Sequence, residues 1–201
     1  MTKPIASFRI DAEDRVIDCN GDLSPYCSIH GGTLLGFSPD LDIGSPWLSN
    51  VPSDSLRLYL RLLATAVRAT GTPFRYPYCG EVNGIHYQFE FHLSLLFQGD
   101  IAVDHFLIGT RQTATPYPLT AAPAEHALLR CCTLCSRVND GYGWRERAQV
   151  FAAWPQTPGT EIPAIFSVCW DCSEDLGPRV SALFQRGMEN TARGLPEKAA
   201  A

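Results

Sequence analysis

The sequence lacks several features that would assign a function directly. No apolar stretch reaches the ~18 residues that a membrane-spanning helix needs, and the start MTKPIASFRIDAEDR contains no apolar segment of a secretory signal. The sequence also has no nucleophile elbow, HExxH, phosphate-loop or dinucleotide-binding motif, and no local pair of acidic residues that suggests catalysis. We therefore expect a non-enzymatic, cytoplasmic protein without a membrane partner.

Positive charge is also scarce. The 201 residues include 16 Lys or Arg against 21 Asp or Glu, which gives a net charge of −5, and the cationic residues are scattered. This balance argues against broad electrostatic binding to nucleic acid. Nucleic-acid binding through the C-terminal part stays a less favoured alternative, in which the phosphates would contact Arg130, Arg137, Arg145, Arg147 and Arg179.

Two cysteine pairs are present instead, Cys132-Thr-Leu-Cys135 and Cys169-Trp-Asp-Cys172. Each pair places two thiols on one tight turn, and together they supply four ligands for a tetrahedral Zn²⁺. Four sulfurs close the coordination sphere, so we predict a structural zinc rather than a catalytic one. Cys131 adjoins Cys132 and competes with it as a ligand, although the CxxC spacing favours Cys132.

Composition divides the chain into parts. Residues 112–123 contain three prolines among Thr and Ala residues, which predicts an extended connector. We expect a front domain over residues 1–111, a zinc module over 124–187 and a flexible tail over 188–201.

Local patterns predict the elements of both halves. Apolar–polar alternation predicts a hairpin of residues 6–10 and 15–20. A helix should run from Ser53, its N-cap, to Thr70, and Gly71 should end it. Three strands over 74–79, 84–97 and 101–111 follow. In the second half of the chain, local patterns predict a hairpin around Trp144 and a strand over 162–168. They also predict a helix after Cys172 that Pro178 breaks or restarts.

The element order and several motifs resemble those of PAS domains. Val16-Ile-Asp-Cys-Asn20 is similar to the V-x-x-x-N end of a PAS strand, and Pro73-Phe-Arg-Tyr-Pro-Tyr-Cys79-Gly80-Glu81 to the PFRYPYRCD strand of small bacterial PAS proteins with a C-terminal double-CxxC module. Residues 132–138, Trp144 and the second cysteine pair resemble that module. The resemblance implies an α+β fold, with a PAS-like antiparallel five-stranded sheet, helices on one face, and a small treble-clef-like zinc module.

The same resemblance implies a sensory or regulatory role. The PAS-like domain would bind a small ligand or a regulatory protein partner and form a homodimer, and the zinc module would stabilise the C-terminal part or dock a partner. Cys19, Cys27, Cys79 and His30 are candidates to line a ligand pocket, although free cysteines are more often buried as small hydrophobic residues.

A haem- or metal-binding sensor is the alternative. If Gly99-Asp100 forms a two-residue turn, Ser94 lies opposite His105, and His92 and His105 share one face of the sheet. Imidazole is a good ligand for iron, copper and zinc. The other interpretation is that both histidines lie on a solvated or interface-facing strand surface.

Overall fold

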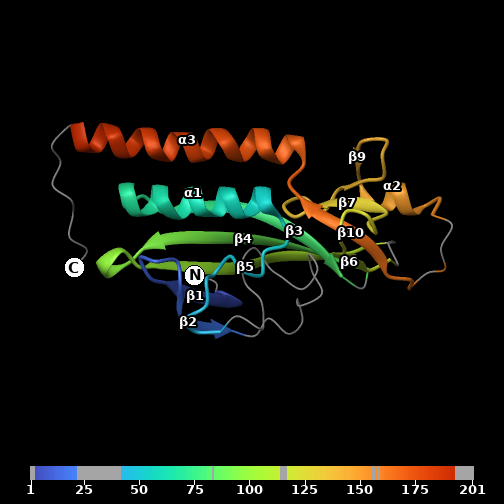
Figure 1. The fold of residues 1–201 in the computed structure, drawn as a ribbon, viewed down its shortest axis with the longest axis horizontal. Helices are drawn as coiled ribbons and strands as arrows, with labels where there is room; N and C mark the ends of the chain where they lie inside the picture. The colour runs from blue at the N-terminus through green and yellow to red at the C-terminus, as the bar shows by residue number, and fades with distance from the viewer. Residues whose placement is uncertain are drawn as a thin grey trace.

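Two five-stranded sheets and two long helices form the part of the chain that the computed structural model describes, residues 3–21, 42–82, 84–113, 117–154, 157 and 159–192 (Figure 1). The fold is therefore a mixture of α and β structure, as predicted. None of the helices in these ranges is long and apolar enough to cross a membrane.

The first sheet is antiparallel, as predicted, and its strands lie in the order β2-β1-β5-β4-β3. Its strands are β1 (Ala6–Ile10), β2 (Val16–Gly21), β3 (Phe74–Val82), β4 (Ile85–Leu95) and β5 (Ile101–Gln112). Side chains alternate along each strand, so that Phe8, Phe91 and Val103 all point into one core. β3 lies at one edge of this sheet, and its free edge faces the second half of the chain.

Helix α1 (Asp54–Thr70) covers one face of the first sheet (Figure 1). The hydroxyl of Ser53 accepts a hydrogen bond from the amide of Leu56, which caps the first turn. Gly71 ends the helix with a φ of 64°, and its amide donates to the carbonyl of Val67. Both predicted ends are confirmed. The buried residues of the helix form an apolar stripe that consists of Leu56, Leu60, Leu63, Ala64, Ala66 and Val67.

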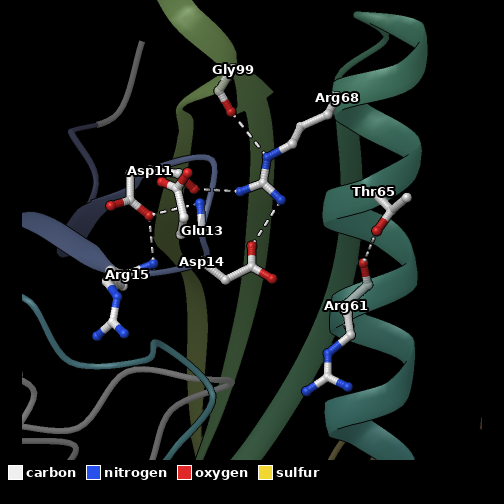
Figure 2. Close-up of polar contacts among 8 residues, drawn as sticks. All are labelled: Asp11, Glu13, Asp14, Arg15, Arg61, Thr65, Arg68 and Gly99. Carbon is white, nitrogen blue, oxygen red and sulfur yellow. Dashed lines mark hydrogen bonds and ion pairs between the residues drawn. The ribbon is translucent and has the colours of Figure 1, made fainter.

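Arg68 ties the last turn of α1 to two turns of the sheet (Figure 2). Its guanidinium donates to the carbonyl oxygens of Gly99 and Asp11, at 3.0 and 2.7 Å, and forms an ion pair with the carboxylate of Asp14 at 2.8 Å. One side chain therefore holds the β1–β2 turn and the β4–β5 connection against the helix.

The second sheet is mixed, with strand order β6-β10-β7-β8-β9. Its strands are β6 (Leu119–Ala121), β7 (Leu129–Cys132), β8 (Val138–Asn139), β9 (Trp144–Arg145) and β10 (Ile162–Ser167), and a short helix α2 (Arg147–Phe151) follows β9. The predicted hairpin at Trp144 is present as β8–β9. β10 runs parallel to both β6 and β7.

β6 corrects one expectation, because it lies inside the segment 112–123 that was predicted to be a connector. Pro118 and Pro123 lie on either side of the three residues of the strand, so neither removes a hydrogen bond from it, and β6 pairs with β10 from Leu119 to Ala121. Part of the segment is therefore extended, as predicted, but belongs to the second sheet.

Helix α3 (Trp170–Ala192) lies along α1 on the side away from the sheet (Figure 1). The two helices run parallel, since Ser173 contacts Tyr59 near their first turns and Gly187 contacts Thr70 near their last. The helix continues to Ala192, into the range 188–201 that was expected to be a flexible tail.

Pro178 does not break α3, contrary to the prediction. A proline inside a helix removes one hydrogen bond and crowds the preceding turn. Here, Leu176 before it and Val180 and Leu183 after it are buried in the same core. Tertiary packing on both sides of the proline therefore outweighs its local preference.

Candidate metal centre

The four cysteines of the two CxxC pairs lie together. The sulfur atoms of Cys132, Cys135, Cys169 and Cys172 are all within 4.8 Å of one another, and those of Cys135 and Cys169 are 3.6 Å apart. A tetrahedral ion with metal–sulfur bonds of ~2.3 Å requires sulfurs about 3.8 Å apart, whereas a disulfide requires ~2.05 Å. All four thiols are free. The spacing and the soft donors therefore fit one metal ion and do not fit a pair of disulfides.

Parallel pairing of β7 and β10 brings together the two CxxC turns, which we call the first knuckle (Cys132–Cys135) and the second knuckle (Cys169–Cys172). Ser167, at the end of β10, pairs with Cys132, at the end of β7, so that both CxxC turns leave the same edge of the sheet. The first turn closes through a hydrogen bond from the Cys132 amide to the Arg137 carbonyl, at 2.8 Å. The second opens α3, and Cys172 lies in the first turn of that helix.

Cys131 and Cys132 point to opposite faces of β7. Cys132 belongs to the first core and to the sulfur cluster, whereas Cys131 is buried among Leu129, Val138 and Phe166 in a separate core. Burial raises the pKa of the Cys131 thiol to about 12. The cluster therefore contains Cys132 and leaves out Cys131.

The four clustered thiols hold their protons unequally. Hydrogen bonds from the neighbouring thiols, that of Cys132 first, hold the pKa of Cys135 below its ordinary value. Hydrogen bonding within the same cluster raises the pKa values of Cys132 and Cys172. A backbone amide, that of Cys169, also donates to the Cys132 sulfur at 3.3 Å. A divalent cation would displace the shared protons, because thiols bind metals as thiolates.

Arg137 contacts both knuckles, a role that the sequence reasoning missed. Its guanidinium lies 3.4 Å from the Cys135 sulfur and 3.7 Å from the Cys169 sulfur, and it forms a 2.7 Å ion pair with Asp171 in the first turn of α3. The signal in the sequence was a cation two positions after the first CxxC pair. From the sequence this residue is expected to contact a phosphate in the nucleic-acid alternative, and it also lies within residues 132–138, which resemble the zinc module.

The first knuckle also binds the free edge of β3. The amide of Cys79 donates to the carbonyl of Leu134 at 2.8 Å, and the hydroxyl of Ser136 donates to the carbonyl of Cys79 at 3.0 Å. Leu134 is buried in the first core. The cysteine cluster is thus connected directly to the sheet. Burial raises the pKa of the Cys79 thiol to about 12, and this sulfur is not among the four clustered ones.

Arg147 joins the two sheets from the other side of this contact. Its side chain donates to the carbonyls of Tyr117 and Glu81, at 2.7 and 3.4 Å, and pairs with the Glu81 carboxylate at 3.7 Å. Burial raises the pKa of Glu81.

Because only 6% of Arg147 is exposed, the expectation that it contacts phosphates is wrong. Three of the other four arginines named for that role form ion pairs with Asp171, Asp140 and Asp175.

His92 and His105 do not share a face of the sheet, which corrects the geometry expected for a second metal or haem site. Residues 96–100 form the connection between β4 and β5, with a single turn of 3₁₀ helix at Phe97–Gly99, so the predicted two-residue turn is absent. His105 therefore lies opposite Phe91, and His92 lies opposite Asp104. The longer connection shifts the register by an odd number, which moves one histidine to the other face.

Each histidine has its own partner. His105 is fully buried, and its Nδ1 lies 2.9 Å from the hydroxyl of Tyr78. Burial lowers the pKa of His105 to about 3, so the ring is neutral at ordinary pH. His92, on the outer face, contacts the carboxylate of Glu90 and the ring of Phe106. Neither arrangement brings the two imidazoles to one ion.

Three further residues were expected to line a ligand pocket, Cys19, Cys27 and His30. Cys19 lies on β2 and is partly buried, and burial raises the pKa of its thiol. Cys27 and His30 lie outside the described residues.

Comparison of the chain with models of protein families, with curated proteins and with solved structures gives no match. The geometry of the cysteine cluster and its contacts therefore carries the functional argument.

Proposed function

We propose that this chain is a non-enzymatic regulatory protein in which a structural zinc centre attaches a C-terminal module to a PAS-like sensory sheet. The observation that carries the proposal is the closed set of four sulfurs within 4.8 Å of one another. Four thiolates fill a tetrahedral zinc site and leave no position for a water molecule, which a catalytic zinc needs. The ion would supply cross-linking of β7, β10 and α3, and no chemistry of its own.

The arrangement of elements supports two parts of the proposal, the PAS-like form of the first sheet and the treble-clef-like form of the C-terminal module. A hairpin, a long helix and a three-stranded meander follow one another in the order that the PAS resemblance implied. After the meander, the first knuckle is followed by the β8–β9 hairpin, and a helix then begins at the second knuckle, which favours a treble-clef-like module. Fold alone does not determine function, so the regulatory role rests on the closed metal site together with these elements.

Regulation would act through binding. The PAS-like sheet would take a small ligand or a regulatory protein, and the simplest assembly is a cytoplasmic homodimer through this sheet. Sedimentation of the purified protein tests the last point, because a species of one chain at all concentrations would contradict it.

Metal analysis tests the zinc centre. We expect one zinc per chain and no visible absorption band, and Co²⁺ substitution should give the spectrum of a tetrahedral site with four thiolates. Cys135→Ser should lose the metal, and the matched variant Cys131→Ser should keep it. A colourless protein that takes up no zinc, or a Soret band that identifies bound haem, would overturn the proposal.

A further inference from the structure

Arg137 is the cation that connects the two cysteine knuckles in the described part of the chain. Its Nε and Nη2 atoms approach sulfurs that come from different knuckles, those of Cys135 and Cys169. These two sulfurs are themselves only 3.6 Å apart. The guanidinium therefore lies where the two halves of the site meet.

The charge of the site explains why a cation is needed there. Four thiolates around one divalent ion carry a net charge of −2, and Cys132 and Cys169 are both buried. A negative charge in a partly buried site is stabilised by hydrogen bonds and opposite charge. Arg137 supplies both, because its planar fork directs several N–H groups toward different acceptors at once.

Both ends of Arg137 are anchored. Its backbone carbonyl accepts the hydrogen bond from the Cys132 amide that closes the first knuckle. Its guanidinium pairs with Asp171, which lies in the second knuckle and in the first turn of α3. This residue therefore connects the end of β7 to the start of α3 even without an ion.

We propose that Arg137 is a positioning residue of the metal centre, which sets the metal affinity by holding the Cys135 and Cys169 sulfurs together and offsetting their charge. This inference rests on the proposed zinc site. Residues that hydrogen-bond to metal ligands change metal affinity by about 10- to 100-fold when they are replaced. We expect a loss of that size for Arg137→Met.

Zinc titration against a chromophoric chelator measures the effect on the full chain. Arg137→Lys keeps the charge but has a single donor group, so its affinity should lie between those of the wild type and Arg137→Met. Asp171→Asn removes the anchor of the guanidinium and should weaken binding less than Arg137→Met. Arg130→Met is the matched control, because Arg130 is exposed on β7 of the same module.

The Co²⁺ form gives a second readout that a purely structural role would not move. Loss of two N–H···S contacts should shift the sulfur-to-cobalt charge-transfer bands of Arg137→Met and leave those of Arg130→Met unchanged. Circular dichroism of the zinc-saturated variants establishes that they are folded. Equal zinc affinity and equal bands in Arg137→Met and the wild type would overturn the inference. A wild-type chain that binds no zinc would overturn the proposed function itself.

Discussion

The backbone amide of Cys79 on β3 donates to the carbonyl of Leu134 in the first cysteine knuckle, at 2.8 Å. This hydrogen bond joins an edge strand of the first sheet to a turn that ends in a candidate metal ligand. An edge strand has unpaired backbone groups that another segment can satisfy. The knuckle does so here, so the state of the cysteine cluster and the order of the β3 edge are physically linked.

Ser136 gives a direct test of this contact. Its hydroxyl donates to the Cys79 carbonyl, and its backbone has a φ of 60°, in the region that favours glycine. Ser136→Ala should lower the free energy of unfolding by about 1–2 kcal/mol, because it loses the hydrogen bond and keeps the strained backbone. Ser136→Gly should lose less, since the backbone strain is relieved. Urea unfolding of the two variants checks the order, and an equal loss would contradict the role of the backbone.

Gly187 makes the close approach between α3 and α1. A Cβ atom there would lie 2.3 Å from Cγ2 of Thr70, whose hydroxyl accepts a hydrogen bond from the Thr72 amide and so resists rotation. Gly187→Ala should therefore destabilise the protein by about 1–3 kcal/mol.

Gly177 provides the matched control on the same helix, because no atom lies within 4 Å of the position of its Cβ. Gly177→Ala should be neutral or slightly stabilising, since higher helix propensity is opposed by the crowding before Pro178. Equal melting temperatures of the two variants would contradict the close contact between α1 and α3 at Gly187.

Arg68 should contribute to stability through the three contacts drawn in Figure 2. Arg68→Met leaves two carbonyls and one carboxylate without their partner, so we expect a loss of about 1–3 kcal/mol in unfolding free energy. Arg61→Met is the control, because the contact of Arg61 in the same view is made by its backbone carbonyl. A comparable loss in both variants would mean that general helix charge, rather than this anchor, is responsible.

His105 should make stability fall in acid. The pKa of His105 is about 3 in the folded chain because of burial, against about 6.5 for an unperturbed histidine. Between these two values the unfolded chain binds a proton that the folded chain does not. Stability contributed by the neutral ring is fully present above pH 6.5 and is lost by about 1.4 kcal/mol per pH unit below it.

Comparison with His105→Asn isolates the contribution of His105 to the pH dependence of stability. Asparagine can still hydrogen-bond to Tyr78 but does not titrate, so the difference in stability between the wild type and the variant should shrink as the pH falls from 7 to 5. Loss of zinc in acid affects both chains and does not enter the difference. Parallel pH profiles in urea unfolding would show that His105 is not the titrating group.

Local patterns predicted most elements of the first sheet. α1 was predictable at both ends, because a side-chain cap and a left-handed glycine act within one helical turn. The register between β4 and β5 was not predictable from such local signals. The two-residue turn Gly99-Asp100 and the observed connection over 96–100 differ by a few residues, yet that difference decides on which face His105 lies.

The candidate metal site, like the first sheet, could be predicted from the sequence only in part. The spacing of the CxxC pairs predicted which cysteines come together, since each pair is local and soft ligands favour one ion. The contacts of Arg137, Leu134 and Ser136 depend on the parallel pairing of β7 with β10 and on the position of β3. Such long-range packing leaves no local pattern. It also overrode the local preference of Pro178 to interrupt α3.

Amide hydrogen exchange with and without zinc tests the central claim most directly. We expect removal of the metal by a chelator, or the substitution Cys172→Ser, to speed exchange in peptides from β3 and α3, because the knuckle no longer holds the Cys79 amide and the first turn of the helix. Exchange in the middle of β4, which pairs with β3 and β5 on its two sides, should change little. Unchanged protection of β3 and α3 after complete loss of the metal would contradict the account.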